Sequence, residues 1–184
     1  PDEAADLLGE LEPADQEYLK QLIDAPVGDR TLWRPRWPDL DAYYVLIGKA
    51  QRVREGTHAT VVSYGRPLPL CVQAADSLHA SHGLTFDVID LRSIFPYDWA
   101  LISQSVLKTG RVLFVNEDTE VTNFGEHLLR RVVEEHFYDL LVRPRVLQGQ
   151  HVPGIGLNQM YERNTVPQPP TVLEAMRALA TEEA

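Results

Sequence analysis

The sequence contains a single cysteine, Cys71, among its 184 residues. One cysteine forms neither an internal disulfide nor a cysteine metal cluster, and such sparing use is typical of a cytoplasmic protein. No apolar run approaches the roughly 20 residues of a membrane-spanning helix, and no signal peptide is visible. The first residue is proline rather than methionine, so we expect a processed product, a cloned segment or part of a longer protein.

Basic residues are too few to balance the acidic ones, and the formal net charge is −10 at pH 7. This charge argues against nucleic acids and anionic membranes as partners. Residues 1–30 hold much of the excess, with nine acidic and two basic residues. We therefore predict an acidic, partly helical arm over residues 1–30 and a domain over residues 31–184.

Within the arm, Tyr18, Leu19, Leu22 and Ile23 form an apolar stripe that predicts a short helix at about 13–24. Such a stripe needs a covering surface, which is either the domain itself, a neighbouring chain or a specific docking partner. Residues 31–42, with Trp33 and Trp37, are interpreted as a proline-stiffened linker. We expect the arm and the linker to lie against a partner domain.

An apolar strand, an amphipathic helix and a second strand follow one another twice between Arg52 and Glu117. The pattern predicts strands at 60–65, 86–92 and 111–117, with helices at 67–81, ended by Gly83, and at 96–108, opened by Pro96 and ended by Gly110. Two such consecutive units predict an α/β fold with a parallel sheet. The chain is long enough to bury a substantial core.

The remaining segments are assigned by the same patterns. We predict an extended stretch at 44–50, a turn at 54–57 and a helix over 123–141 that is capped by Asn123. His136 falls on the apolar face of that helix, which favours a hydrogen-bonded core histidine over a metal ligand. A short strand at 145–147, an irregular stretch at 148–170 and a helix over 171–180 complete the chain.

Candidate site residues are sought at the carboxyl ends of the strands, where open α/β sheets bind ligands. Asp90 and Arg92 follow the second predicted strand and Glu117 follows the third, so all three meet if those strands are neighbours. They form either a carboxylate pair with a shifted pKa or an ion-paired structural cluster, and the arginine favours the latter. Gly65 and Arg66 indicate a tight turn rather than an anion site, because phosphate loops need several glycines. No histidine spacing resembles a zinc site.

Eight short motifs occur in an order that resembles one known domain. They are Leu32-Trp33-Arg34, Gly48-Lys49-Ala50, Arg54-Glu55-Gly56, Val62-Ser63-Tyr64-Gly65, Val88-Ile89-Asp90-Leu91-Arg92, Pro96-Tyr97-Asp98, Lys108-Thr109-Gly110-Arg111 and Phe124-Gly125. Over residues 31–180 the chain resembles the carboxyl-terminal domain of the β chain of thiamine-diphosphate-dependent 2-oxo acid dehydrogenases, of the branched-chain and pyruvate type. This domain belongs to the transketolase carboxyl-terminal superfamily.

The resemblance implies a three-layer α/β/α fold with a mostly parallel five-stranded sheet and one antiparallel edge strand. It implies a non-catalytic part of an enzyme that decarboxylates a 2-oxo acid and passes the acyl group to lipoyl. Thiamine diphosphate and magnesium are then bound by pyrimidine-binding and pyrophosphate-binding domains absent from this sequence, and this segment is inactive alone. Its partners are those domains and the dihydrolipoyl acyltransferase, within a homodimer or heterotetramer.

The chain departs from the family pattern at two places. Val142-Arg143-Pro144 stands where relatives often carry an acidic residue that helps to receive the acyltransferase, and Gln150-His151-Val152-Pro153 replaces a usual Asp-Thr-Pro run. The departures put pyruvate-type docking in doubt and leave open a variant complex or a chain fused to its other domains. Two other assignments also stay open. One is the same domain of a transketolase or a deoxyxylulose-phosphate synthase, and the other is a free-standing, non-enzymatic interaction domain.

Overall fold

The computed structural model describes residues 45–156 and 158–183, which belong to one compact unit. Its elements are β1 (Gln51–Arg54), β2 (Ala59–Ser63), α3 (Pro67–His82), β3 (Phe86–Asp90), α4 (Trp99–Thr109), β4 (Val112–Thr119), α5 (Phe124–His136), the 3-10 turn η2 (Phe137–Asp139), β5 (Arg145–Gly149), α6 (Gln159–Thr165) and α7 (Pro169–Thr181). The predicted acidic arm, its helix, the linker and the boundary after residue 30 lie outside the described residues.

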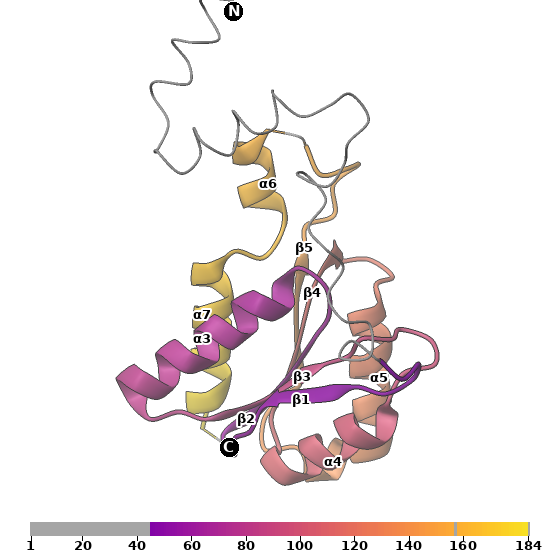
Figure 1. Ribbon diagram of the computed structural model, residues 1–184, viewed down its shortest axis with the longest axis vertical. Helices are drawn as coiled ribbons and strands as arrows, with labels where there is room; N and C mark the ends of the chain where they lie inside the picture. The colour runs from indigo at the N-terminus through magenta and orange to yellow at the C-terminus, as the bar shows by residue number, and fades with distance from the viewer. Residues whose placement is uncertain (1–44, 157, 184) are drawn as a thin grey trace, which may run out of the picture. The chain divides into compact units, whose positions relative to one another are not determined.

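The five strands form one sheet in the order β1-β3-β2-β4-β5. Strand β2 pairs in parallel with β3 and β4, and β4 pairs in parallel with β5. Strand β1 runs antiparallel to β3 at the edge. Helices α3 and α7 cover one face of the sheet and α4 and α5 cover the other (Figure 1). The expected three-layer fold, with its single antiparallel edge strand, is confirmed.

The central strand shows why the sheet is covered on both sides. All five residues of β2 are buried, which is typical of a parallel strand with helices on both faces. Val61 points into the layer of α3 and α7, and Val62 points into the layer of α4 and α5. Cys71 of α3 is fully buried in the first layer, and burial raises the pKa of its thiol to about 12.

Several predicted helix ends are confirmed. Gly83 and Gly110 end α3 and α4 in the left-handed conformation, with φ of 69° and 63°. The Asn123 side chain accepts a hydrogen bond from the backbone N–H of Glu126 and caps α5. His136 is buried, and one of its ring nitrogens shares a hydrogen bond with the Ser103 hydroxyl at 2.8 Å, as expected for a core histidine.

Several local predictions were wrong. Helix α4 starts at Trp99 rather than at Pro96, because the Asp98 side chain accepts from the N–H of Leu101 and caps it there. Helix α5 ends at His136, where the chain tightens into η2. The described part of 44–50 contains a turn around Gly48, with φ of 77°. The turn predicted at 54–57 starts one residue later, because Arg54 is still the last residue of strand β1.

The stretch predicted to be irregular, 148–170, contains helix α6. The Asn158 side chain accepts from the N–H of Met160 and so supplies the cap of this short helix. The helix lies beyond the carboxyl edge of the sheet, the edge at which the parallel strands end (Figure 1).

Candidate functional site

Asp90 and Arg92 lie together at the end of β3. The Arg92 Nε is 3.4 Å from Asp90 Oδ2, and the Arg92 backbone N–H donates to Asp90 Oδ1 at 3.2 Å. The Arg92 guanidinium also donates to the side-chain carbonyl of Gln51 on β1. Arg92 has a φ of 58°, an uncommon conformation for a residue with a side chain. The carboxylate of Asp90 thus holds a strained residue in place at the edge of the sheet.

Glu117, the third predicted member, has a different partner. Strand β2 lies between β3 and β4, so Glu117 is separated from Asp90 by a whole strand. Its carboxylate lies 3.5 Å from the Arg66 guanidinium, which also pairs with Glu162 of α6 at 2.8 Å. The structure therefore brings Asp90 and Arg92 together and leaves Glu117 with Arg66. Arg66 contacts two carboxylates, which makes the turn at Gly65 a poor place for an anion.

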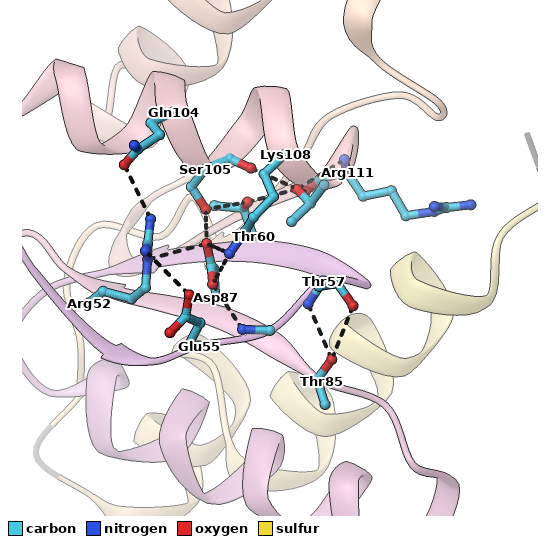
Figure 2. Close-up of polar contacts among 12 residues, drawn as sticks. Arg52, Glu55, Thr57, Thr60, Thr85, Asp87, Gln104, Ser105, Lys108 and Arg111 are labelled. Atoms are coloured by element: carbon cyan, nitrogen blue, oxygen red, sulfur yellow. Dashed lines mark hydrogen bonds and ion pairs between the residues drawn. The ribbon is translucent and has the colours of Figure 1, made fainter.

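Among the described residues, the most deeply buried charged side chain is that of Asp87 on β3, which the sequence analysis did not select. Figure 2 shows Arg52, Ser105 and Lys108 converging on it. The Ser105 hydroxyl lies 2.7 Å from the carboxylate, the Lys108 amine 2.6 Å and the Arg52 Nε 3.3 Å, and the backbone N–H of Gly56 donates to it at 2.9 Å. The carboxylate is fully buried and has partners on both of its oxygens. The arrangement satisfies the charge completely, so it ties β1, β3 and α4 together rather than presenting a reactive group.

A chain of hydroxyl groups continues from this carboxylate. The Ser105 hydroxyl lies 2.7 Å from that of Thr60 (Figure 2). The Thr60 hydroxyl in turn lies 2.8 Å from that of Thr109. The only local signal for this network was an acidic residue placed between apolar strand residues. Its partners come from segments 18 or more positions away, which no local pattern reveals.

A second network lies over α4 and α5. The Glu135 carboxylate accepts from Arg131 and from the Trp99 indole, both at 2.7 Å. The Tyr97 hydroxyl lies 2.8 Å from both Arg131 and His127. The hydrogen bonds from Arg131 and Trp99 lower the pKa of Glu135. The pKa of Arg131 is raised, mainly by its hydrogen bond to Glu135 and next by its hydrogen bond to Tyr97. The donors and acceptors of these side chains are paired with one another, so we interpret the network as structural rather than catalytic.

Several large apolar side chains of the described residues are exposed, and two groups of them form surfaces. We name the first the edge patch, and it consists of Val45, Leu46, Ile47, Ile94 and Phe95. Ile47 and Phe95 are 82% and 90% exposed, although both are large apolar side chains. The two loops are held together because the N–H of Ala50 donates to Asp98 at 3.3 Å, and a Cβ on Gly48 would lie 3.0 Å from Pro96.

We name the second surface the amino-edge groove, because it lies where the parallel strands begin. It is lined by Val133, Phe137, Tyr138, Leu140, Leu141, Val142, Arg143 and Pro144, and its volume is about 510 Å³. Exposed apolar surfaces of this kind mark sites of interaction or ligand-binding grooves. None of the described helices is long and apolar enough to cross a membrane.

The chain shows clear similarity to known proteins. Residues 48–172 match the family model described as the transketolase C-terminal domain. The 2-oxoisovalerate dehydrogenase subunit beta of Bacillus subtilis is 34% identical over 76% of this chain and 42% of its own length. The mitochondrial pyruvate dehydrogenase E1 component subunit beta of Caenorhabditis elegans is 34% identical over 83% of this chain and 41% of its own length.

A solved structure described as a split gene transketolase, inactive beta4 tetramer, superposes with a TM-score of 0.65. It is 23% identical and covers 76% of this chain and 45% of that one, so it shows a shared fold. The chain thus spans less than half the length of the curated relatives described above.

Proposed function

Because the chain belongs to the transketolase C-terminal domain family, we propose that it is the terminal, non-catalytic domain of a thiamine-diphosphate-dependent 2-oxo acid dehydrogenase. The whole enzyme oxidatively decarboxylates a 2-oxo acid and passes the acyl group to lipoyl. The observation that carries the proposal is similarity along most of this chain to β subunits of branched-chain and pyruvate dehydrogenases. Because the chain matches less than half of those subunits, the reaction is assigned to the assembled enzyme.

Among the described residues, the candidate carboxylates at the sheet edge are engaged with arginines rather than left to hold a cofactor. Thiamine diphosphate is held through a magnesium ion, which takes oxygen ligands such as carboxylates. No group of three or more His, Cys, Asp and Glu side chains within residues 45–156 and 158–183 is arranged to hold a metal ion. The carboxylates of Asp90 and Glu117 at the sheet edge are paired with arginines. We therefore assign cofactor binding to the pyrimidine-binding and pyrophosphate-binding domains and derive no step through the cofactor.

The edge patch supports a role in assembly. Five large apolar side chains on two adjacent loops leave a surface that is costly to expose to water. We propose that other domains or chains of the same enzyme cover it, in a homodimer or heterotetramer. The dihydrolipoyl acyltransferase is the proposed partner that collects the acyl group.

Activity of the full-length protein tests the proposal. We expect the protein that contains this chain, together with any separately encoded partner chain, to release CO₂ from 2-oxoisovalerate or pyruvate when thiamine diphosphate and magnesium are present. Transfer of the acyl group to a lipoyl domain should follow. Ketol transfer between sugar phosphates, without decarboxylation, would instead assign the domain to a transketolase.

Two further measurements separate the roles. Calorimetric titration of thiamine diphosphate into the 184-residue chain should show no binding, and tight binding would refute the non-catalytic assignment. In the full-length protein, Phe95→Asp should lower the native mass and the activity together. Met160→Asp, which alters an exposed apolar residue on α6, is the matched control and should change neither.

A further inference from the structure

A pocket lies between the end of β1, the second half of α3 and the start of β3, and we name it the β1–α3 pocket. Its floor is apolar and buried, and its mouth is formed by exposed charged and polar side chains. The floor consists of Ala75, Leu84 and Phe86, and the mouth of Arg54, Glu55, Asp76 and His79. The floor residues belong to the core layer of α3 and α7, so packing fixes them before any ligand binds. The pocket volume is about 130 Å³. A cavity of about 150 Å³ is enough to hold benzene, so this pocket has room for a side chain of about four carbon atoms.

Arg54, at the mouth of the pocket, has unused hydrogen-bond donors. Its Nε and Nη2 donate to the two carboxylate oxygens of Asp76 at 2.8 and 2.9 Å, and its Nη1 donates to the carbonyl of Val53 at 2.8 Å. A guanidinium carries one N–H on Nε and a pair on each terminal nitrogen. One N–H on Nη1 and one on Nη2 therefore remain without a partner among the described residues. Two such terminal N–H groups can bind a carboxylate in parallel, and the side chain is 45% exposed, so a ligand can reach them.

Two carboxylates stand beside this arginine. That of Glu55 is 79% exposed and lies 3.9 Å from Arg52, which is too far for a hydrogen bond. The hydrogen bond from Arg54 lowers the pKa of Asp76, so this carboxylate is ionised at neutral pH. His79 completes the mouth, and its ring makes no hydrogen bond to the described residues. One guanidinium and two carboxylates suit a ligand that carries both a positive and a negative group better than they suit a simple anion.

We propose that the β1–α3 pocket binds an α-amino acid with an apolar side chain. The carboxylate of the ligand accepts from the free N–H groups of Arg54, its ammonium group lies between Glu55 and Asp76, and its side chain covers the apolar floor. Small-molecule pockets have this composition, since they are mainly apolar and carry a few polar groups that fix the orientation of the ligand. Each charged group of the ligand meets an opposite charge, which selects it against molecules of the same shape that lack one of the two charges. The inference goes beyond the proposed function and holds whichever reaction the whole enzyme catalyses.

Nuclear magnetic resonance titration of the isotope-labelled 184-residue chain with L-leucine tests the inference. We expect saturable shifts of the amide signals of residues 54–56, 75–79 and 84–86, with a Kd of roughly 1 mM for so small a ligand. Three analogues each remove one part of the ligand: isocaproate lacks the ammonium group, isoamylamine lacks the carboxylate and glycine lacks the side chain. Each should bind roughly tenfold more weakly than leucine. Absence of shifts in these segments at about 20 mM leucine, or binding of any analogue as tight as that of leucine, would overturn the inference.

Matched variants identify the residues that bind the ligand. Arg54→Gln should weaken leucine binding roughly tenfold and leave isoamylamine binding unchanged, because the amine has no carboxylate for the guanidinium. Asp76→Asn should weaken the binding of leucine but not that of isocaproate, which has no ammonium group. Arg130→Gln, which removes another exposed, ion-paired arginine on α5, is the control and should leave all affinities unchanged. Amide signals of Arg54→Gln that keep their positions away from the pocket show that its fold is intact. If Arg54→Gln binds leucine as tightly as the wild type, or if Arg130→Gln weakens leucine equally, the assignment is wrong.

Discussion

The guanidinium carbon of Arg131 lies 4.1 Å from the centroid of the Trp99 ring, and the same arginine and the same indole donate to the two oxygens of Glu135. Arg131 and Trp99 are therefore linked in two ways. The guanidinium lies over the indole ring, and both groups donate hydrogen bonds to the carboxylate of Glu135. Trp99 also stacks on His136, whose ring contacts Ser103. These contacts join α4 and α5 into one layer, and they make the stability of that layer dependent on pH.

The first prediction concerns acid and Glu135. Its pKa is lowered from an ordinary value of 4.5 by the hydrogen bonds from Arg131 and Trp99. As the pH falls, Glu135 therefore becomes protonated at a higher pH in the unfolded chain than in the folded one. The ionised carboxylate stabilises the fold fully above its ordinary pKa, and this stabilisation is lost as the pH falls through the lower pKa of the folded state. The difference in unfolding free energy between wild type and Glu135→Gln should shrink on acidification below pH 4.5.

Urea unfolding at a series of pH values measures this difference. Glu134→Gln, which removes a neighbouring surface carboxylate bonded only to Arg130 in the described structure, is the control. A difference between wild type and Glu135→Gln that stays constant from neutral to acidic pH would contradict the prediction.

The second prediction concerns the buried charge of Asp87. Asp87→Asn should lower the free energy of unfolding by about 3 kcal/mol, because Arg52 and Lys108 lose the carboxylate that offsets their own desolvation. Chemical denaturation followed by circular dichroism provides the measurement. Asp76→Asn, which breaks an exposed ion pair with Arg54, should have a much smaller effect. Comparable losses for the two variants would show that burial does not set the cost.

The third prediction concerns Gly56, at the turn before β2. A Cβ at this position would lie 2.1 Å from the backbone nitrogen of Phe86, so neither side can yield without moving β3. Gly56→Ala should lower stability by more than about 2 kcal/mol, seen as a drop in Tm or loss of folded protein. At Gly65, no atom lies within 4 Å of an added Cβ. Gly65→Ala should therefore lower the free energy of unfolding by only about 1 kcal/mol, because alanine is disfavoured at a φ of 64°.

The fourth prediction concerns the thiol of Cys71. It is fully buried, and burial raises its pKa to about 12, so almost no thiolate exists at pH 8. A thiol reagent should label the native chain only at the rate at which the domain opens, and labelling should become rapid in denaturant. Rapid labelling of the native chain, monitored by mass spectrometry, would place Cys71 in a more open environment than the described one.

Local patterns in the sequence predict the positions of helices and strands better than they predict which of these lie side by side in the fold. Apolar runs and the caps at Gly83, Gly110 and Asn123 located the central strands and most helix ends. The position of β2 between β3 and β4 separates Glu117 from Asp90, and it follows from crossover connections that no local pattern encodes. The role of Asp87 likewise depends on partners distant in the chain.

Strand β1 carries a consequence for how this protein associates. Its pairing with β3 is interrupted at Val53, and the Arg54 guanidinium donates to the carbonyl of Val53. The free edge of β1 is therefore irregular, one of its carbonyls already accepts a hydrogen bond, and it carries Arg52 and Arg54. Such an edge is a poor template for pairing with another strand. Growth of the sheet into a continuous ribbon through this flank is thereby discouraged, which protects the protein against fibril-like aggregation and directs larger complexes toward side-chain contacts.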